Sequence, residues 1–367
     1  MKSRKTALIT GFIAVLFPVC AQSVGQSSIL IPYNVQKIAR VTGNTEAGES
    51  LPNPNQTAQK YDVGGTDLGI GWDMGNGVVG WWFGDTYGKS FTPQPQGGPA
   101  NNDNWRSNVL AFSHDGNLED GLLIDSMVVD NQGDAKELIY GAKNTTGEGD
   151  WTSIPTAAVR VGNVDYIHYM NIRKWLEAGN WSTNYSAVYR SSDSGKNWSP
   201  TAVRFDAQSN FSQVGFAKKD GYVYMVGTRP GRLHPAYLCR IPEAEMENKE
   251  KYAYWNAEKG WLVNEELSAT PIVQDGVGEL SLLYHTGFKR WIMTYMNEKK
   301  YSLLLRSASC ITGPWSEPVT LAEGKEYPGL YGAFMYPLKN DGNILYFLMS
   351  QWKPYNVFLM RANLKLE

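Results

Sequence analysis

The sequence predicts an all-β protein, a five-bladed β-propeller. Short apolar strands recur along the chain, turns rich in Gly, Asn or Asp separate them, and a motif typical of propeller hairpins lies among them. From Asp62 onward the theme repeats roughly every 40 to 60 residues. Five units that cannot each bury their own sheet faces favour a ring of blades. A β-sandwich uses similar strands but does not need five repeats of one motif.

Each repeat begins with a strand that a propeller places around its central channel. The first repeat turns at Asn76-Gly77, a dipeptide typical of tight hairpins. Residues 243–252, charged on most faces, are the one convincing helical stretch and are expected between the third and fourth blades. The predicted first strands are residues 65–70, 157–163, 213–217, 279–284 and 332–336.

The amino terminus has the features of a secretory signal. A basic start precedes an apolar run, and small residues mark a cleavage site after Ala21. The alternative is a lipoprotein signal that lipidates Cys20, but the residues before Cys20 are not the small ones that such a signal carries. We therefore expect residues 1–21 to be a signal peptide and the protein to be exported, to the periplasm or the extracellular space.

The rest of the chain divides into an arm and one domain. Residues 22–60 are rich in Asn, Gln, Thr, Gly and Pro and are expected to form an N-terminal arm and loop. Within this arm, residues 29–41 are the candidate strand that closes the ring. Residues 61–367 are expected to form the five-bladed catalytic domain.

Composition excludes some functions and favours one kind of partner. The chain has 34 Lys and Arg residues against 36 Asp and Glu residues, so its charge does not favour binding to nucleic acid. The four histidines lack metal-ligand spacing, so we expect neither a metal nor a cofactor. Cys239 and Cys310 are expected as separately buried thiols, with a disulfide between them as the alternative. The 13 Trp and 21 Tyr suit surfaces that stack sugar rings, and the expected partner is a polysaccharide.

Beyond the signal, no stretch approaches the ~20 apolar residues that a membrane-spanning helix needs. The oligomeric state is not determined by the sequence.

Residues 191–198 carry the propeller hairpin motif. They read Ser-Ser-Asp-Ser-Gly-Lys-Asn-Trp, the S-x-D-x-G-x-x-W turn of sialidase-like propellers. Asp193 is expected to cap the backbone amides of its own hairpin while Trp198 packs beneath it. We therefore expect a structural role for this motif.

Two carboxylates in the first repeat are the candidates for chemistry. If the hairpin turns at Asn76-Gly77, antiparallel pairing places Asp67 and Asp85 nearly opposite each other. Neighbouring carboxylates in a low dielectric push one pKa upward, and glycoside cleavage uses one protonated and one ionised acid. We expect Asp67 as the nucleophile and Asp85 as the proton donor, with retention of configuration; the alternative is that either Asp only caps a Gly-rich turn.

Further candidates line the expected funnel. Glu279 lies among glycines at the start of the fourth repeat and is expected either as a third catalytic or hydroxyl-binding group or as part of a salt bridge. Trp72, Trp105 and Tyr331 are candidate sugar platforms in an open cleft. The remaining candidate substrate-binding residues are Arg106, Asn108, Asp165, His168, Gln213, Arg229 and Gln351.

Several segments together resemble a known family. The stretches 65–71, 83–86, 105–111, 164–170, 183–187, 327–332 and 350–358 resemble the endo-D-arabinofuranase propellers of glycoside hydrolase family 183, once listed as a domain of unknown function. The likeness covers about residues 60 to 364. It implies an endo-acting hydrolase of α-D-arabinofuranosyl linkages in mycobacterial D-arabinan, with a carboxylate pair that maps onto Asp67 and Asp85.

Three other functions compete with this interpretation. A non-catalytic sugar-binding propeller would keep aromatic platforms without a close acid pair. A hydrolase of L-arabinan or fructan would use the same architecture. A sialidase needs an arginine cluster that grips a carboxylate, for which Arg106, Arg160 and Arg229 are the candidates.

Overall fold

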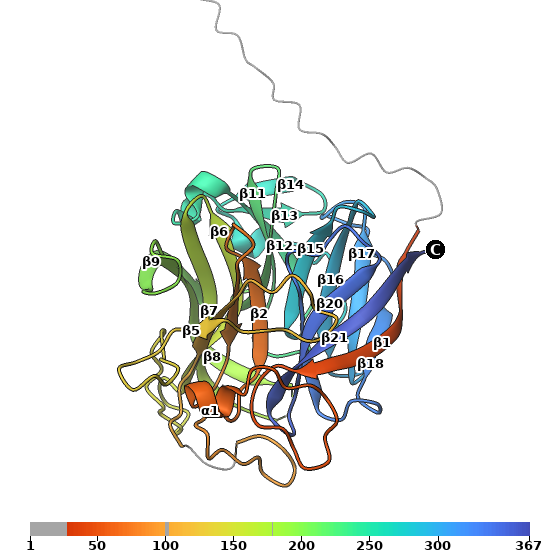
Figure 1. Cartoon of the computed structure of the whole chain (residues 1–367). Coiled ribbons are helices and arrows are strands. Elements are labelled where there is room, and N and C mark those ends of the chain that lie inside the picture. The colour runs from red at the N-terminus through yellow and green to blue at the C-terminus, as the bar shows by residue number, and fades with distance from the viewer. Residues whose placement is uncertain (1–27, 100–102, 178) are drawn as a thin grey trace, which may run out of the picture.

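Five antiparallel sheets form a ring in the computed structural model, which describes residues 28–99, 103–177 and 179–367 (Figure 1). The innermost strands contact one another in cyclic order, and the last contacts the first. The prediction of an all-β, five-bladed propeller is therefore confirmed, whereas the expected signal at residues 1–21 lies outside the described residues. The inner strands are β2 (Leu68–Asp73), β6 (Thr152–Val161), β10 (Gln213–Lys219), β15 (Leu280–His285) and β19 (Leu330–Met335).

Each blade continues outward from its inner strand through antiparallel neighbours. Blade one adds β3 (Val79–Phe83), β4 (Val109–Ser113) and β5 (Ser126–Met127). Blade two adds β7 (Val164–Trp175), β8 (Trp181–Ser191) and β9 (Ser199–Asp206). Blade three adds β11 (Tyr222–Thr228), β12 (Tyr237–Pro242), β13 (Ala253–Asn256) and β14 (Gly260–Val263). Blade four adds β16 (Arg290–Asn297), β17 (Ser302–Ala308) and β18 (Val319–Glu323).

Blade five closes the ring with a strand from the other end of the chain. After β20 (Ile344–Gln351) and β21 (Asn356–Leu366), its outermost strand is β1 (Leu30–Arg40), which pairs antiparallel with β21 from Leu30↔Leu366 to Arg40↔Phe358. Figure 1 shows these first and last strands side by side. The expected closing strand at residues 29–41 is thus confirmed.

Blade three differs from the prediction. It has five strands where each of the other described blades has four, because β13 and β14 form a hairpin that extends its outer edge. The helix expected at residues 243–252 is replaced by two 3₁₀ turns, η1 (Glu243–Glu245) and η2 (Lys249–Lys251). These turns lie between β12 and β13, within the blade and not after it. The buried Tyr252, whose hydroxyl donates to the carbonyl O of Met246 at 2.7 Å, holds this reversal of the chain.

Two short helical segments complete the described secondary structure, α1 (Thr57–Tyr61) before blade one and the 3₁₀ turn η3 (Glu266–Ser268) after β14. No helix among the described residues is long and apolar enough to cross a membrane.

The hairpin motif at residues 191–198 has the expected structural role. Asp193 Oδ1 accepts from the amide N of Asn197 at 3.0 Å, and the Trp198 indole donates to the carbonyl O of Gly195 at 2.9 Å. The Trp198 ring packs edge-on against Trp82 of blade one at 5.1 Å between centroids. The turn therefore joins blade two to blade one.

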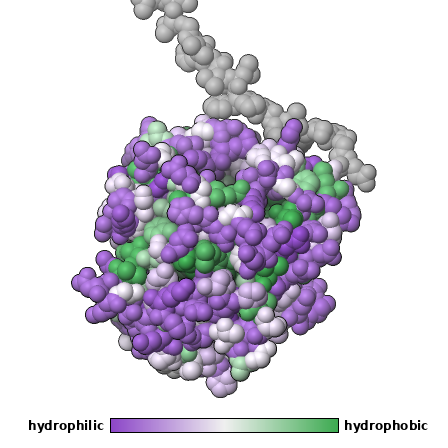
Figure 2. Space-filling view, in the orientation of Figure 1, coloured by the Kyte–Doolittle hydropathy of each residue, from purple (hydrophilic) through white to green (hydrophobic). Residues whose placement is uncertain are grey.

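Apolar side chains between the blades form the core, and Cys239 belongs to it. Cys239 is a free, buried thiol, so the alternative disulfide with Cys310 does not form. The surface visible in Figure 2 is largely hydrophilic, with hydrophobic residues gathered in the middle of the view.

Removal of the closing strand is expected to destabilise the whole ring. A chain that begins at residue 42 leaves the ladder edge of β21 unpaired and uncovers the core residues behind β1, so its Tm should fall by at least about 10 °C. A chain that begins at residue 28 is the matched control and should melt as the full chain does. Circular dichroism melting and size-exclusion chromatography give the readout; equal melting of the two truncated chains would contradict the closing role of β1.

Candidate active site

A cavity of about 720 Å³ lies at the end of the ring where all five inner strands begin. Its walls combine carboxylates with many aromatic side chains. A concave site with a few convergent polar groups among apolar walls is the usual form of a ligand site. Six of the residues singled out from the sequence line it: Asp67, Asp85, Trp105, Gln213, Glu279 and Tyr331.

A bulge in β2 presents Asp67 to the cavity. The pairing of β2 with β3 shifts after Leu68, and Gly69 is the extra residue. Leu68 and Gly69 have φ angles of 70° and 86°, in the left-handed region that a leucine adopts only under strain. Asp67 consequently faces Gly84, whose amide N donates to the Asp67 carbonyl O at 3.1 Å. Asp67 and Asp85 therefore lie within one residue of direct pairing, nearly opposite each other as predicted, and both line the same cavity.

The carboxyl group of Asp67 has few hydrogen-bond partners. The Tyr331 hydroxyl donates to its Oδ2 at 2.9 Å, whereas its Oδ1 is buried without a partner. Burial is the main reason that the pKa of Asp67 rises to about 8, and the charge of Asp85 is the second. At neutral pH the neutral, protonated form of Asp67 therefore predominates.

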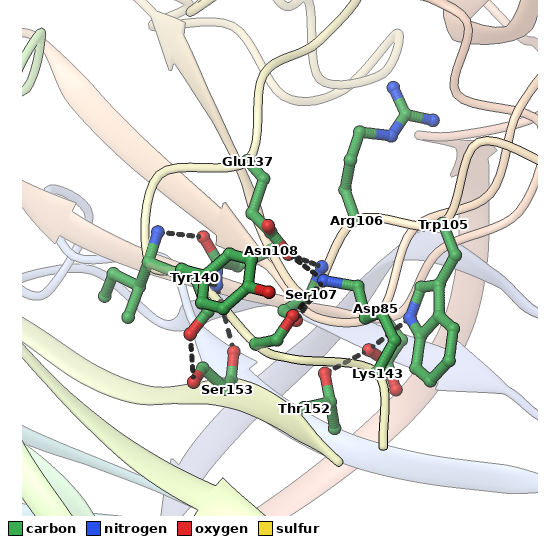
Figure 3. A network of polar contacts seen from close by, with 12 residues as sticks. Asp85, Trp105, Arg106, Ser107, Asn108, Glu137, Tyr140, Lys143, Thr152 and Ser153 are labelled. Carbon is green, nitrogen blue, oxygen red and sulfur yellow. Dashed lines mark hydrogen bonds and ion pairs between the residues drawn. The ribbon is translucent and has the colours of Figure 1, made fainter. Parts of the chain in front are cut away.

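Asp85 has a more polar environment. Its Oδ1 accepts from the Trp105 indole at 2.8 Å and from the Thr152 hydroxyl at 2.5 Å, as Figure 3 shows. Burial raises the pKa of Asp85 to about 6, and these two hydrogen bonds and the Lys143 charge limit the rise. At neutral pH Asp85 is therefore mainly ionised.

The two carboxyl groups thus have opposite protonation states near pH 7. A pair whose environments separate its pKa values has the composition that acid and base catalysis needs. The order of the pKa values opposes the roles expected from the sequence, since Asp67, not Asp85, holds the proton. The cause is local: the charges of Asp85 and Glu279 raise the pKa of Asp67 further, whereas the Lys143 charge lowers that of Asp85.

A second group of charged residues lies across the cavity. Arg232 donates to both oxygens of Glu279, with its Nη2 2.8 Å from Oε1 and its Nε 3.0 Å from Oε2, and its Nη1 lies 2.9 Å from Glu298 Oε2. Both alternatives for Glu279 therefore have support, since it lines the cavity and forms a salt bridge. Because each Glu279 oxygen already accepts an N–H group, Glu279 is poorly placed to deliver a proton.

Comparison with known proteins identifies the family of the chain. The family model described as Domain of unknown function (DUF4185) matches residues 52–361. The chain belongs to this family. Notoamide biosynthesis cluster protein J of Aspergillus sp. (strain MF297-2) is 30% identical over 321 residues, which are 81% of this chain and 82% of that protein.

Two solved structures are similar to this DUF4185 protein. The crystal structure of a Bacteroides ovatus ATCC 8483 protein has 11% identity and a TM-score of 0.57, covers 83% of this chain and 86% of its own, and shares the fold. The catalytic domain of Coprinopsis cinerea GH62 α-L-arabinofuranosidase has 10% identity and a TM-score of 0.49, and covers 91% of this chain and 98% of its own.

Two of the expected sugar platforms, Trp72 and Trp105, donate hydrogen bonds to carboxylates in this DUF4185 member. Trp72 is buried at the opposite end of the hairpin, where its indole donates to Asp165 Oδ1 at 2.9 Å. The Trp105 ring stacks on Tyr87 at 6.1 Å between centroids, and its indole N–H is used by Asp85. Trp72 therefore joins blades one and two, and Trp105 orients a carboxylate.

Seven of the expected site residues lie outside the cavity wall, because each satisfies buried or local polar groups instead. Arg106 donates to the carbonyl O of Asn104 and of Ala135, each at 2.9 Å. The buried Asn108, labelled in Figure 3, donates to the carbonyl O of Ile139 at 2.7 Å and accepts from its amide N at 3.0 Å. His168 is buried beside the Thr156 hydroxyl, and burial lowers its pKa to about 3. The seven are Trp72, Arg106, Asn108, Asp165, His168, Arg229 and Gln351.

The arginine cluster of a sialidase is not formed. Arg106 holds backbone carbonyls, Arg160 is paired with Asp165, and Arg229 donates to Asn210 Oδ1 at 2.9 Å. Arg232, which was not singled out, is the arginine in the described cavity wall, and it is shared by two glutamates. No group of three or more potential metal ligands converges among the described residues.

Several residues of the site were missed in the sequence. Thr152 and Arg232 act through partners that are distant along the chain, and no local motif marks either of them. Trp352 lies in residues 350–358, one of the stretches that resemble the endo-D-arabinofuranase family, and this resemblance was the sequence signal that could have identified it as a site residue. The other missed aromatic residues of the wall are Tyr87, Trp151, Trp175, Trp181, Tyr301, Phe334 and Tyr355.

The raised pKa of Asp67 predicts a pH-dependent cost to stability. The folded protein keeps the Asp67 proton up to about pH 8, whereas an unfolded chain loses it near pH 4, so wild-type stability falls as the pH rises through this window. Asp67→Asn removes this cost and should gain on the order of a few kcal/mol relative to the wild type between pH 4 and 8.

Urea unfolding at several pH values measures this effect. Asp193→Asn is the control of opposite sign: local hydrogen bonds lower the pKa of Asp193 to about 2, so its loss should destabilise at pH 6 and matter least near pH 2. A stability difference between Asp67→Asn and wild type that stays constant from pH 4 to 8 would show that Asp67 titrates normally.

Proposed function

We propose that this protein is a glycoside hydrolase that cleaves α-D-arabinofuranosyl linkages inside D-arabinan of the mycobacterial type. The observation that carries the proposal is the pair of carboxyl groups with opposite protonation states in one aromatic-walled cavity. The choice of D-arabinan rests on the resemblance to the endo-D-arabinofuranase propellers. The signal-like amino terminus supports action outside the cytoplasm.

In the proposed mechanism Asp67 is the general acid. Its carboxyl group protonates the glycosidic oxygen as the bond to the anomeric carbon breaks, and the hydroxyl of Tyr331 holds the group in place. Asp85 is the nucleophile, oriented by Trp105 and Thr152. Water then hydrolyses the glycosyl-enzyme, with Asp67 as the base that takes its proton.

The register of the hairpin favours two displacements with retention of configuration. Asp85 lies one residue beyond Gly84, the partner of Asp67, so both acids project from the same end of one hairpin. Close carboxyl groups suit direct attack on the sugar, whereas a single displacement needs room for a water molecule between acid and base.

The charge of the cavity supports a neutral glycan as substrate. Its described wall contains five carboxyl groups and one guanidinium, from Asp67, Asp85, Glu177, Glu279, Glu298 and Arg232. Such a wall repels uronic and sialic acids. A strained bulge and a poorly solvated acid both lower the stability of the fold. Sugar binding alone does not require either feature, so their presence argues against a non-catalytic sugar-binding propeller.

Conservative replacement of either acid should abolish most activity. Asp67→Asn and Asp85→Asn should each lower kcat by at least about 10²-fold, because each removes a group that acts in the transition state. Asp73→Asn, at the other end of the same hairpin, is the matched control and should retain activity. Near-normal turnover by either cavity variant would remove that residue from the mechanism, and proton NMR of the first product reports the stereochemistry.

The pH profile should be bell-shaped. Activity rises as Asp85 ionises through about pH 6 and falls as Asp67 loses its proton through about pH 8, so kcat/KM peaks near neutrality. An alkaline limb that is unchanged in Asp67→Asn assayed on an activated glycosyl fluoride, which needs little acid assistance, would contradict the assignment of that limb to Asp67.

Purified full-length protein incubated separately with mycobacterial arabinogalactan, plant L-arabinan and a fructan tests the substrate. Oligosaccharides from arabinogalactan are expected from the start of the reaction. Cleavage of only L-arabinan or fructan would leave the mechanism standing but refute the proposed linkage.

A further inference from the structure

Aromatic side chains lie on both sides of the acid pair. The inner strands contact in the order β2, β6, β10, β15, β19 and back to β2, so blades two and five flank blade one. Trp151 and Trp175 of blade two line the cavity, and Trp352 of blade five lines it as well. A glycan that crosses blade one therefore meets an aromatic surface on each side of Asp67 and Asp85.

Trp352 is held rigidly although it is half-exposed. The residue is 45% exposed, and its ring contacts Tyr331 and Tyr355 edge-on, with centroids 6.3 Å and 5.6 Å away. Gly97 and Gly98 of blade one lie so close to the indole that a Cβ at either position would collide with it. A large apolar ring that is fixed by its surroundings and open to the cavity loses little entropy when it stacks on a sugar.

Tyr301 extends this surface from the neighbouring blade four. The residue is 44% exposed, and its hydroxyl accepts from the amide N of Gly329 at 2.6 Å. The carbonyl O of the same Gly329 accepts from the amide N of Trp352 at 2.7 Å. One glycine thus links the Tyr301 hydroxyl to the backbone of Trp352, and both side chains line the cavity. We call Trp352 and Tyr301 the blade-five rim.

The two acids are attached to opposite sides of the cavity. Asp67 accepts its hydrogen bond from Tyr331 of blade five, whereas Asp85 accepts one from Thr152 of blade two. A general acid donates to the oxygen that departs with the leaving sugar, so the leaving sugar lies on the side of the acid. The side of Asp67 is the side of the blade-five rim.

We propose that the glycan binds with one polarity: the part that leaves stacks on Trp352 and Tyr301, and the part that reacts with Asp85 lies against Trp151 and Trp175. This inference rests on the proposed glycosidase function and deepens it, because it assigns the two ends of the substrate to two named surfaces. An occupied surface on each side of the acids also accounts for cleavage inside a chain.

Two substrates separate the two surfaces. D-Arabinan occupies both sides, whereas an α-D-arabinofuranosyl oligosaccharide fluoride has a leaving group too small to reach the blade-five rim. Trp352→Ala should lower kcat/KM on D-arabinan about tenfold and change it less than twofold on the fluoride. Trp175→Ala should lower kcat/KM on both substrates by a similar factor. Tyr33→Ala, an exposed aromatic on the outer strand β1, is the matched control and should affect neither.

The outcomes are distinguishable. Equal losses on both substrates for Trp352→Ala, or a selective loss on D-arabinan for Trp175→Ala, would overturn the polarity while leaving the hydrolase standing. Trp352→Phe and Trp175→Phe, which keep a smaller ring, should give intermediate effects and guard against misfolding of the Ala variants.

Failure of the wild type to hydrolyse either substrate would instead overturn the proposed function and the polarity together. In that case calorimetry of unlabelled D-arabinan oligosaccharides with wild type and Trp352→Ala still tests the rim, and equal affinities would refute it.

Discussion

Closure of the ring by β1 and β21 is the constraint on which the rest of the structure depends. A single blade of three or four strands cannot bury both faces of its sheet, so each blade is stable only between two neighbours. The first and last strands of the fold belong to the same blade, and their pairing spans almost the whole chain. The closed ring holds the inner strands in place. Because of this, the two acids of blade one keep fixed positions relative to Tyr331 of blade five and Thr152 of blade two, which donate hydrogen bonds to them.

The candidate site contains two features that lower the stability of the fold, and the closed ring compensates for them. Leu68 has a strained left-handed conformation, and one oxygen of Asp67 is buried without a hydrogen-bond partner. Neither feature helps folding, and both serve to place a protonated acid in the cavity. Both features lie on one hairpin, whereas the nearby polar groups of Arg106 and Asn108 have hydrogen-bond partners. Local strain that is confined to one site in this way is typical of functional sites.

The sequence predicted what depends on local pattern and failed where a contact depends on tertiary structure. The repeat of hairpins predicted five blades, and both Asp67 and Asp85 were found because they flank one hairpin. The bulge at Gly69 was not predictable, because a glycine in a strand does not reveal its φ, and it shifted the pairing by one residue. The polar residues at blade edges were mostly misplaced, since buried polar groups between blades need partners as much as substrates do. The order of the two pKa values, which opposes the roles expected from the sequence, was missed for the same reason: several of the groups that separate these pKa values come from distant segments.

The cavity carboxylates connect the electrostatics of the site to the kind of substrate that it accepts. The negative charges of Asp85 and Glu279 both raise the pKa of Asp67, so they keep the proton on the group that donates it in the proposed mechanism. A cationic sugar bound here would lower that pKa and remove the proton before the bond breaks. An anionic sugar would be repelled by the same charges. A neutral polyol leaves the Asp67 proton in place and offers hydroxyl groups to the carboxylates, so in the proposed mechanism the charges that raise the pKa of Asp67 also favour an uncharged glycan.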